Sequence, residues 1–201
     1  MSDLHALADL CGSYFQEDRA LDGEDPWGVV DKFVRDKPLL AEWLPGQIYE
    51  VLSDQPTEEQ LRHLVRDDLG CDYLPAAHGW KYQGWLSAIA DRVQQLLADR
   101  KARARNDYAR VSEFFGYFHE DWVDDYPGPW DVVDDFVEDQ PELAAELPKE
   151  VDRLLAENPS EAQLKQLFWE LRCCYYIEAD GWTYRGWLSA VADRVKQATA
   201  A

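Results

Sequence analysis

The chain has 201 residues, and its 40 acidic and 20 basic side chains give a formal net charge of −20. Hydrophobic residues make up 46% of it and aromatic residues 13%, which is too apolar for a disordered acidic tail. No apolar run approaches the roughly 18 residues of a membrane span, and the N-terminal segment lacks the basic and apolar regions of a signal peptide. The acidity also argues against nucleic acid or an anionic membrane as a partner, because phosphate groups are bound by cations. We therefore expect a soluble, cytoplasmic protein whose charged partners are basic.

The sequence contains an internal duplication. With an offset of 103 residues, the matched positions are Tyr14-Phe15 with Tyr117-Phe118, Pro26-Trp27 with Pro129-Trp130, and Cys71 with Cys174. One residue is then lost, and segment 79–88 returns as segment 181–190. Each copy is close to the common size of a single domain. We predict two helical domains, residues 1–99 and 108–201, joined by a basic helical linker at residues 100–107.

Capping signals indicate where several helices begin. Asp25-Pro26 has the pattern of an N-cap followed by proline at the first helical position, and Pro45 is expected to start a further helix. Thr57-x-x-Gln60 and Ser160-x-x-Gln163 are capping boxes at the same place in the two copies. These matched signals predict the same order of helices in both copies.

The remaining segments complete an all-α prediction with about five helices per copy. Apolar residues at helical spacing from Trp85 to Leu96 predict a long final helix, and the basic run 100–105 contains no Gly, Pro or Ser to end it. We expect this basic run to lie against an acidic face. The segment from Gly70 to His78, with its counterpart from Cys173 to Asp180, is expected to be an irregular loop. No β-hairpin or βαβ pattern is present.

The motifs of common active sites are missing from the sequence. The four cysteines have no metal-binding spacing, and the four histidines have no equivalents between the copies. Cys71 and Cys174 are expected to be small buried residues. There is no nucleophile elbow and no phosphate-binding glycine loop. We therefore expect no metal, no cofactor and no catalysis.

Positions shared by the two copies are interpreted as the fold, and positions that differ as candidates for binding. The shared aromatic residues are expected to form the two cores. Residues 111–148 contain twelve acids and no Lys or Arg, whereas the matching residues 8–45 contain nine acids and four bases. Lys32 is replaced by Asp135, and Arg35 is replaced by Glu138. The charge of the second copy is therefore concentrated in its first half.

Asp131, Asp135 and Glu138 are predicted to share the helix face opposite the apolar residues of the same helix. Like charges at this spacing cost roughly 0.2–0.5 kcal/mol per pair. The face is either a solvated surface or a docking surface for a basic protein, with Trp122 and Tyr126 as exposed aromatic anchors. Arg19 and Gly23 hold the anchor positions in the first copy. The partner-binding residues predicted on this basis are Trp122, Asp124, Tyr126, Asp131, Asp135 and Glu138.

Four motifs resemble the α-helical immunity proteins of bacterial contact-dependent growth inhibition and related polymorphic toxin systems. They are Tyr-Phe-His-x-Asp-Trp from Tyr117 to Trp122, the Pro-led helix with Val133 and Phe136, Ser-Glu-x-x-Leu from Ser160 to Leu164, and Gly-x-x-Tyr-x-x-Trp-Leu from Gly181 to Leu188. The resemblance extends from Leu10 to Val93 and again from Val111 to Val195. It implies a non-catalytic protein that binds and neutralises the toxin domain of a cognate secreted effector. A toxin that cleaves nucleic acid would itself be basic, because its substrate is a polyanion.

Two other functions are compatible with the same residues. One is an acidic helical adaptor or scaffold for basic cellular partners, and the other is a DNA-mimic inhibitor. A gene placed just downstream of a large secreted toxin would favour the immunity protein. The sequence does not determine the oligomeric state, and a monomer is compatible with it.

Overall fold

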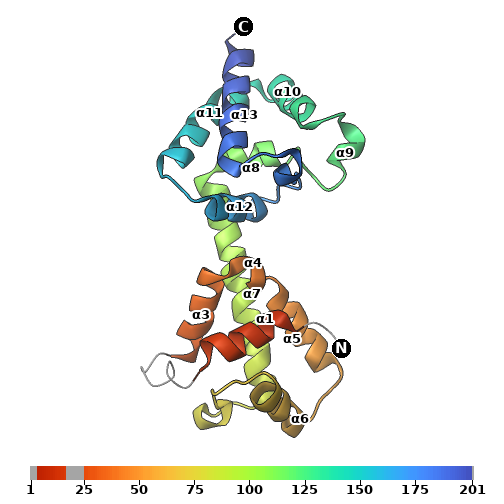
Figure 1. Cartoon of the computed structure of the whole chain (residues 1–201), viewed down its shortest axis with the longest axis vertical. Coiled ribbons are helices and arrows are strands. Elements are labelled where there is room, and N and C mark those ends of the chain that lie inside the picture. The colour runs from red at the N-terminus through yellow and green to blue at the C-terminus, as the bar shows by residue number, and fades with distance from the viewer. Residues whose placement is uncertain (1–3, 17–24, 201) are drawn as a thin grey trace. The chain divides into compact units, whose positions relative to one another are not determined.

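The computed structural model of the chain describes residues 4–16 and 25–200. Within those ranges all regular structure is helical and no strand occurs, which confirms the all-α prediction. The chain forms two compact units, Met1–Asp99 (unit 1) and Arg100–Ala201 (unit 2) (Figure 1). Arg19 and Gly23 lie outside the described residues.

Unit 1 is built around the first part of its last helix. Its elements are α1 His5–Asp9, the π-helical turn η1 Leu10–Tyr14, α3 Pro26–Asp36, α4 Pro38–Ala41, α5 Trp43–Ser53, α6 Glu58–His63, the π-helical turn η2 Leu64–Asp68, the 3₁₀ turn η3 Pro75–His78 and α7 Tyr82–Asp107. In the segment predicted as a loop, η3 is the only regular element among the described residues.

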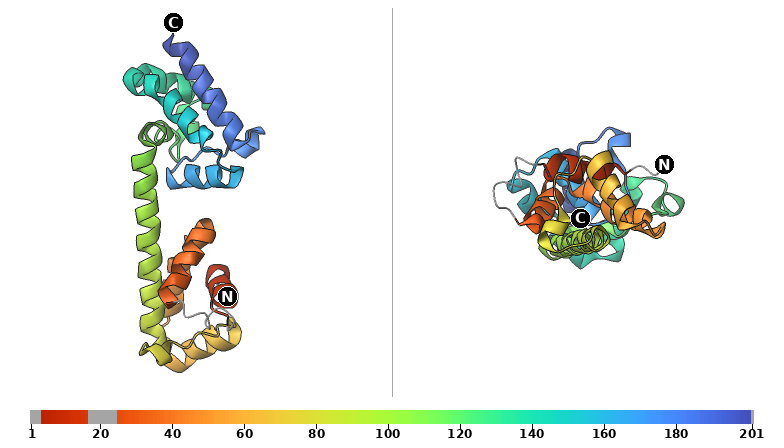
Figure 2. Two further views of the ribbon diagram at one scale, coloured as in Figure 1. Left: turned by 90° about the vertical axis from the view of Figure 1, so that its left-hand side faces the viewer. Right: turned by 90° about the horizontal axis from the view of Figure 1, so that it is seen from below.

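Unit 2 repeats this order and closes on its own last helix. Its elements are α8 Ala109–Phe115, α9 Trp122–Asp125, α10 Pro129–Asp139, α11 Pro141–Ala156, α12 Glu161–Glu170, the 3₁₀ turn η4 Ile177–Asp180 and α13 Tyr184–Thr199. Figure 2 shows α13 running beside α11 within this unit.

The helix α7 continues through the basic run, as predicted. Inside unit 2, the guanidinium of Arg100 lies 2.8 Å from a carboxylate oxygen of the buried Glu170. The ammonium of Lys101 lies 4.2 Å from the centre of a ring of Trp169. The expected contact of the basic run with an acidic side chain is therefore present at its first residue.

The capping predictions are confirmed and one helix start is wrong. The Asp25 carboxylate accepts a hydrogen bond from the backbone of Trp27, and both predicted capping boxes form reciprocally. However, α5 begins at Trp43 instead of Pro45. In unit 2 the matching Pro148 lies inside α11, which begins at Pro141. Packing of the buried apolar face of this helix therefore outweighs the helix-breaking tendency of proline.

Most of the shared aromatic residues lie in the two cores, as predicted, but Trp80 is 38% exposed and packs edge-on against Trp27 outside the buried core. Trp85 in unit 1 and Trp187 in unit 2 are fully buried. The rings of Phe33 and Phe136 meet Tyr14 and Tyr117 edge-on, respectively. Edge-on contacts of this kind add to the free energy gained by burying the rings.

An arginine–carboxylate pair also repeats in both units. Arg92 makes two hydrogen bonds to Asp31 in unit 1, and Arg194 does the same with Asp134 in unit 2. Each pair joins the last helix of its unit to α3 or α10. Asp134 is therefore already paired with an arginine of its own unit.

The one-residue difference between the copies lies earlier than the sequence comparison predicts. The backbone N–H of Asp72 donates to the carbonyl of Phe15, and that of Cys174 donates to the carbonyl of Phe118. Cys174 is therefore the counterpart of Asp72, and it is exposed. The expectation that Cys174 is the buried equivalent of Cys71 is wrong, because that position belongs to the preceding residue.

The turn η2 absorbs the extra residue of unit 1. The N–H of Cys71 bonds to Val65, and the N–H of Cys173 bonds to Phe168, so the two copies are already in their final register here. A π turn takes one residue more than an α turn. Its counterpart α12 is an ordinary α-helix that lacks this residue.

A second π turn, which follows the first helix of unit 1, also takes up one extra residue. Gln47 accepts hydrogen bonds from the N–H groups of Ala6 and Leu7 (both 3.1 Å), and Glu150 accepts one from the N–H of Val111 (2.9 Å). The buried residues Leu7, Leu10 and Cys11 have the same spacing as the buried Val111, Phe114 and Phe115. Leu7 and Val111 therefore correspond, although their offset is one residue longer than that of Tyr14 and Tyr117. The turn η1 contains the additional residue.

Deletion of Asp68 is expected to be tolerated, because unit 2 packs an equivalent core with the shorter helix. The variant should keep its helical circular dichroism, with a melting temperature lowered by no more than about 4–8 °C, the shift that 1 kcal/mol produces in a domain of roughly 100 residues. Deletion of Gln166 from α12 is the control, since it rotates Leu167 and Phe168 off the buried face and should unfold unit 2. Loss of unit 1 structure on deletion of Asp68 would contradict the proposed equivalence.

Candidate functional site: the acidic surface of unit 2

The charge of unit 2 is strongly polarised along its sequence. Residues 111–148, from α8 to the first half of α11, contain twelve acids and no Lys or Arg. The rest of unit 2 contains nine acids and twelve bases. The acidic surface of this unit is therefore formed by α8, α9, α10 and the start of α11.

Trp122 does not lie on this surface. Its side chain is 8% exposed and packs edge-on against Phe118 and Tyr175, with ring centres 5.3 and 5.4 Å apart. The prediction of an exposed anchor is wrong, because the short helix α9 turns this residue into the core.

Tyr126 is half-buried and holds one of the predicted acids. Its hydroxyl donates a hydrogen bond of 2.5 Å to the carboxylate of Asp135. This hydrogen bond, followed by burial, raises the pKa of Tyr126 to about 12. Tyr126 therefore holds the carboxylate of Asp135 in place. The expectation that Tyr126 is an exposed anchor is also wrong, because its side chain is half-buried.

The other predicted acids are exposed but differ in their surroundings. Asp131 lies in the first turn of α10, where a negative charge is stabilised by the helix dipole. Asp124 and Glu138 are exposed, and among the described residues no Lys or Arg forms an ion pair with either of them. Glu138 and Asp124 are therefore the predicted residues most accessible to a partner.

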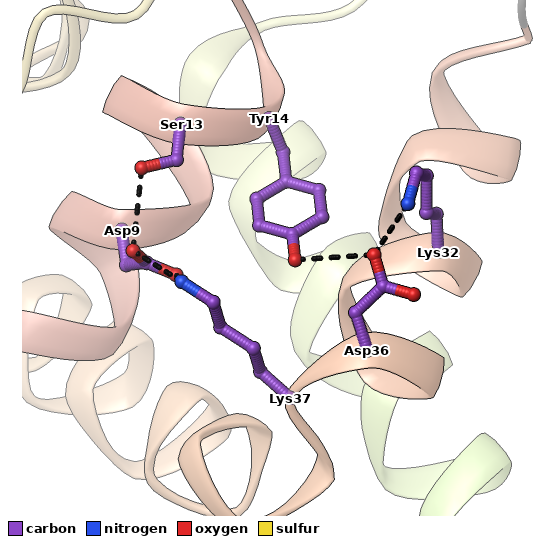
Figure 3. A network of polar contacts seen from close by, with 6 residues as sticks. All are labelled: Asp9, Ser13, Tyr14, Lys32, Asp36 and Lys37. Atoms are coloured by element: carbon purple, nitrogen blue, oxygen red, sulfur yellow. Dashed lines mark hydrogen bonds and ion pairs between the residues drawn. The ribbon is translucent and has the colours of Figure 1, made fainter.

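Unit 1 neutralises the corresponding surface with its own lysines. The residues of this network are Asp9, Ser13, Tyr14, Lys32, Asp36 and Lys37 (Figure 3). The Lys37 ammonium lies 2.7 Å from the nearer carboxylate oxygen of Asp9, and Lys32 pairs with Asp36. The Tyr14 hydroxyl donates to Asp36 at 3.3 Å. Hydrogen bonding by Lys32 lowers the pKa of Asp36, and hydrogen bonding to Asp9 raises the pKa of Lys37.

Both ammonium groups of this network also lie near the ring of Tyr14. The Nζ atoms of Lys32 and Lys37 are 5.8 and 5.7 Å from the ring centre. These distances are within the range of cation–π attraction. The unit 1 surface is therefore an internally occupied site for two organic cations.

Unit 2 retains the acids and the tyrosine of this network but not the lysines. In place of Asp9, Tyr14, Lys32, Asp36 and Lys37, unit 2 has Glu113, Tyr117, Asp135, Asp139 and Gln140, here called the Tyr117 cluster. Burial, together with the nearby carboxylates of Asp139 and Asp135, raises the pKa of Tyr117. In the described part of the chain no Lys or Arg forms an ion pair with the acids of this cluster.

The sequence comparison identified only part of this cluster. Asp135 was predicted as a partner-binding residue, whereas Glu113, Tyr117, Asp139 and Gln140 were not. The replacement of Lys37 by Gln140 was visible in the aligned copies and would have pointed to them. Glu113 could not be matched to Asp9, because η1 shifts the register by one residue.

Two further features bear on what the surface can bind. Among the described residues, no group of three or more His, Cys, Asp or Glu side chains is arranged to hold a metal ion. In the same ranges, no helix has the length and apolarity needed to cross a membrane.

Comparison with known proteins identifies a family for both units. The sequence model described as "CdiI immunity protein" matches residues 3–93 and again residues 111–195. No curated protein and no solved structure matches the chain.

Replacement of Tyr126 by phenylalanine is expected to reduce the alkaline instability of unit 2. The raised pKa means that the folded state holds this proton up to about pH 12, whereas an unfolded tyrosine releases it near its ordinary value of 10. Stability from this group is thus complete below about pH 10 and is lost as the pH rises toward 12. Melting temperatures at pH 8 and pH 11 should differ less for Y126F than for the natural chain. An equal pH dependence in the two proteins would contradict a folded-state role for this hydrogen bond.

Proposed function

We propose that this chain, which belongs to the CdiI immunity protein family, binds and neutralises the toxin domain of a cognate secreted effector. The binding is non-catalytic and takes place in the cytoplasm. The match of the family to both units is the observation that carries the proposal. Inhibition then depends on affinity and on the rate of capture, because nothing in the toxin is chemically altered.

The toxin is proposed to be a basic domain, and the acidic surface of unit 2 is proposed to receive it. The support is the segment of twelve acids without Lys or Arg, together with the loss of the two lysines that neutralise unit 1. Carboxylates that repel one another lower the stability of the free protein by roughly 0.2–0.5 kcal/mol per neighbouring pair on a helix. A basic partner would relieve this repulsion on binding.

A nuclease-like toxin fits this surface. An enzyme that acts on nucleic acid needs a cationic surface for the phosphate backbone. An acidic inhibitor competes for the same surface, and complementary charge raises association rates toward about 10⁸–10⁹ M⁻¹s⁻¹ at low salt. Rapid capture protects a cell from a toxin that acts catalytically.

The direct test is co-expression of this chain with the toxin domain encoded beside its gene. Growth should be rescued, and a complex of the two proteins should survive purification. Failure of rescue with every neighbouring toxin domain would contradict the proposed function. Rescue without a stable complex would contradict neutralisation by binding.

Replacement of Glu138 by arginine is expected to slow capture of the toxin. Arginine is the residue that unit 1 has at this position, Arg35, so the variant should fold normally. Association measured by stopped-flow fluorescence should fall about tenfold at low salt, and the difference should shrink at 1 M salt, where the Debye length is about 3 Å. D193R, on the exposed side of α13, makes the same charge change outside the acidic segment. Equal slowing by D193R would show that net charge, and not this surface, controls the rate.

A further inference from the structure

The Tyr117 cluster and its counterpart in unit 1 are two versions of one site. In unit 1, carboxylates and a tyrosine ring surround the ammonium groups of Lys32 and Lys37. In unit 2 the same positions retain the carboxylates and the ring, without the cations. Unit 1 thus shows which ligand this arrangement holds.

The backbone conformation of Lys37 in unit 1 is the same as that of Gln140 in unit 2. Lys37 has φ −134° and ψ 55°, and Gln140 has φ −130° and ψ 57°. Each residue joins two helices, α3 to α4 in unit 1 and α10 to α11 in unit 2. A side chain at position 140 therefore leaves the backbone in the direction that Lys37 takes.

We propose that a lysine or arginine of the toxin enters the Tyr117 cluster and occupies the place that Lys37 and Lys32 fill in unit 1. This inference rests on the proposed function and specifies unit 2 as the docking unit. The cation is held by the carboxylates of Asp139 and Glu113 and lies against the ring of Tyr117. Charge-assisted hydrogen bonds and cation–π attraction are the interactions that hold it.

We assign the occupant as a protein side chain because the exposed negative charge is more extensive than the cluster itself. Exposed carboxylates on α9 and α10, Asp124 and Glu138 among them, extend the negative charge beyond the size of a single cation. A basic protein can contact this whole area at once. The acids exclude a nucleic acid or an anionic membrane as the occupant.

The test transfers the unit 1 lysines to unit 2. In D135K/Q140K, the new lysines should pair with Asp139 and Glu113 as Lys32 and Lys37 pair with Asp36 and Asp9. Binding to the neighbouring toxin domain, measured by isothermal titration calorimetry, should weaken at least tenfold. Because D135K also removes the acceptor of Tyr126, the single variant Q140K is measured beside it and should weaken binding about fivefold.

Matched controls separate occupation of the cluster from a change in net charge. D193K/Q197K and Q197K carry the same charge changes on exposed positions of α13 and should bind as the natural chain does. Equal weakening by the controls and the transferred lysines would overturn the inference. Zero-length carbodiimide cross-linking of the complex should join Asp139 or Glu113 to a toxin lysine if a lysine is the occupant.

The outcomes distinguish this inference from the proposed function. If the natural chain neither binds the toxin domain nor rescues growth, the proposed function fails. If the natural chain binds and both D135K/Q140K and Q140K bind within twofold of it, the proposed function stands and the inference is overturned.

Discussion

Each unit depends on the burial of one tryptophan near the start of its last helix. In unit 2, Trp187 contacts the rings of Phe114, Phe168 and Tyr175, which come from three separate parts of the unit. In unit 1, Trp85 contacts the corresponding rings of Phe15 and Tyr73. Large aromatic side chains dominate the free energy of such small cores. The rest of the unit must therefore bring its helices to this side chain, which fixes their order and their register.

This constraint explains why the two copies tolerate insertions but not rearrangements. An extra residue appears twice in unit 1, and each time a π turn, η1 or η2, places it before the next core residue. The core contacts on either side of each turn are the same as in unit 2. The surface is under no such constraint, so charged residues can change between copies without any change in the fold.

The fold could be predicted from the sequence because its signals are local. Capping boxes, the Asp25 N-cap and helical periodicity act within a few residues, and the duplication shows which aromatic residues both copies need. The site was predicted less well because exposure depends on tertiary contacts. Trp122 stands where the first copy has Arg19, which is typical of a surface position, yet its ring packs on Tyr175 more than fifty residues away. Similarly, Glu113 could be matched to Asp9 only once the π turn in the first helix was known.

The same polar network occurs in both units, but only in unit 1 are its carboxylates paired with lysines of the same chain. In unit 1 the cations are lysine side chains of the same chain. The conformational entropy of these side chains is therefore lost when the unit folds. In unit 2 the ring of Tyr117 is already held in position by the core, and the carboxylate of Asp135 is held by Tyr126. A cation of the proposed partner would then meet a tyrosine ring that is already ordered. Preorganisation of this kind raises affinity by lowering the entropy lost on binding. In the free protein the carboxylates of unit 2 repel one another, which should lower the stability of this unit. A basic partner that supplies the missing cations should therefore stabilise unit 2 most on this face.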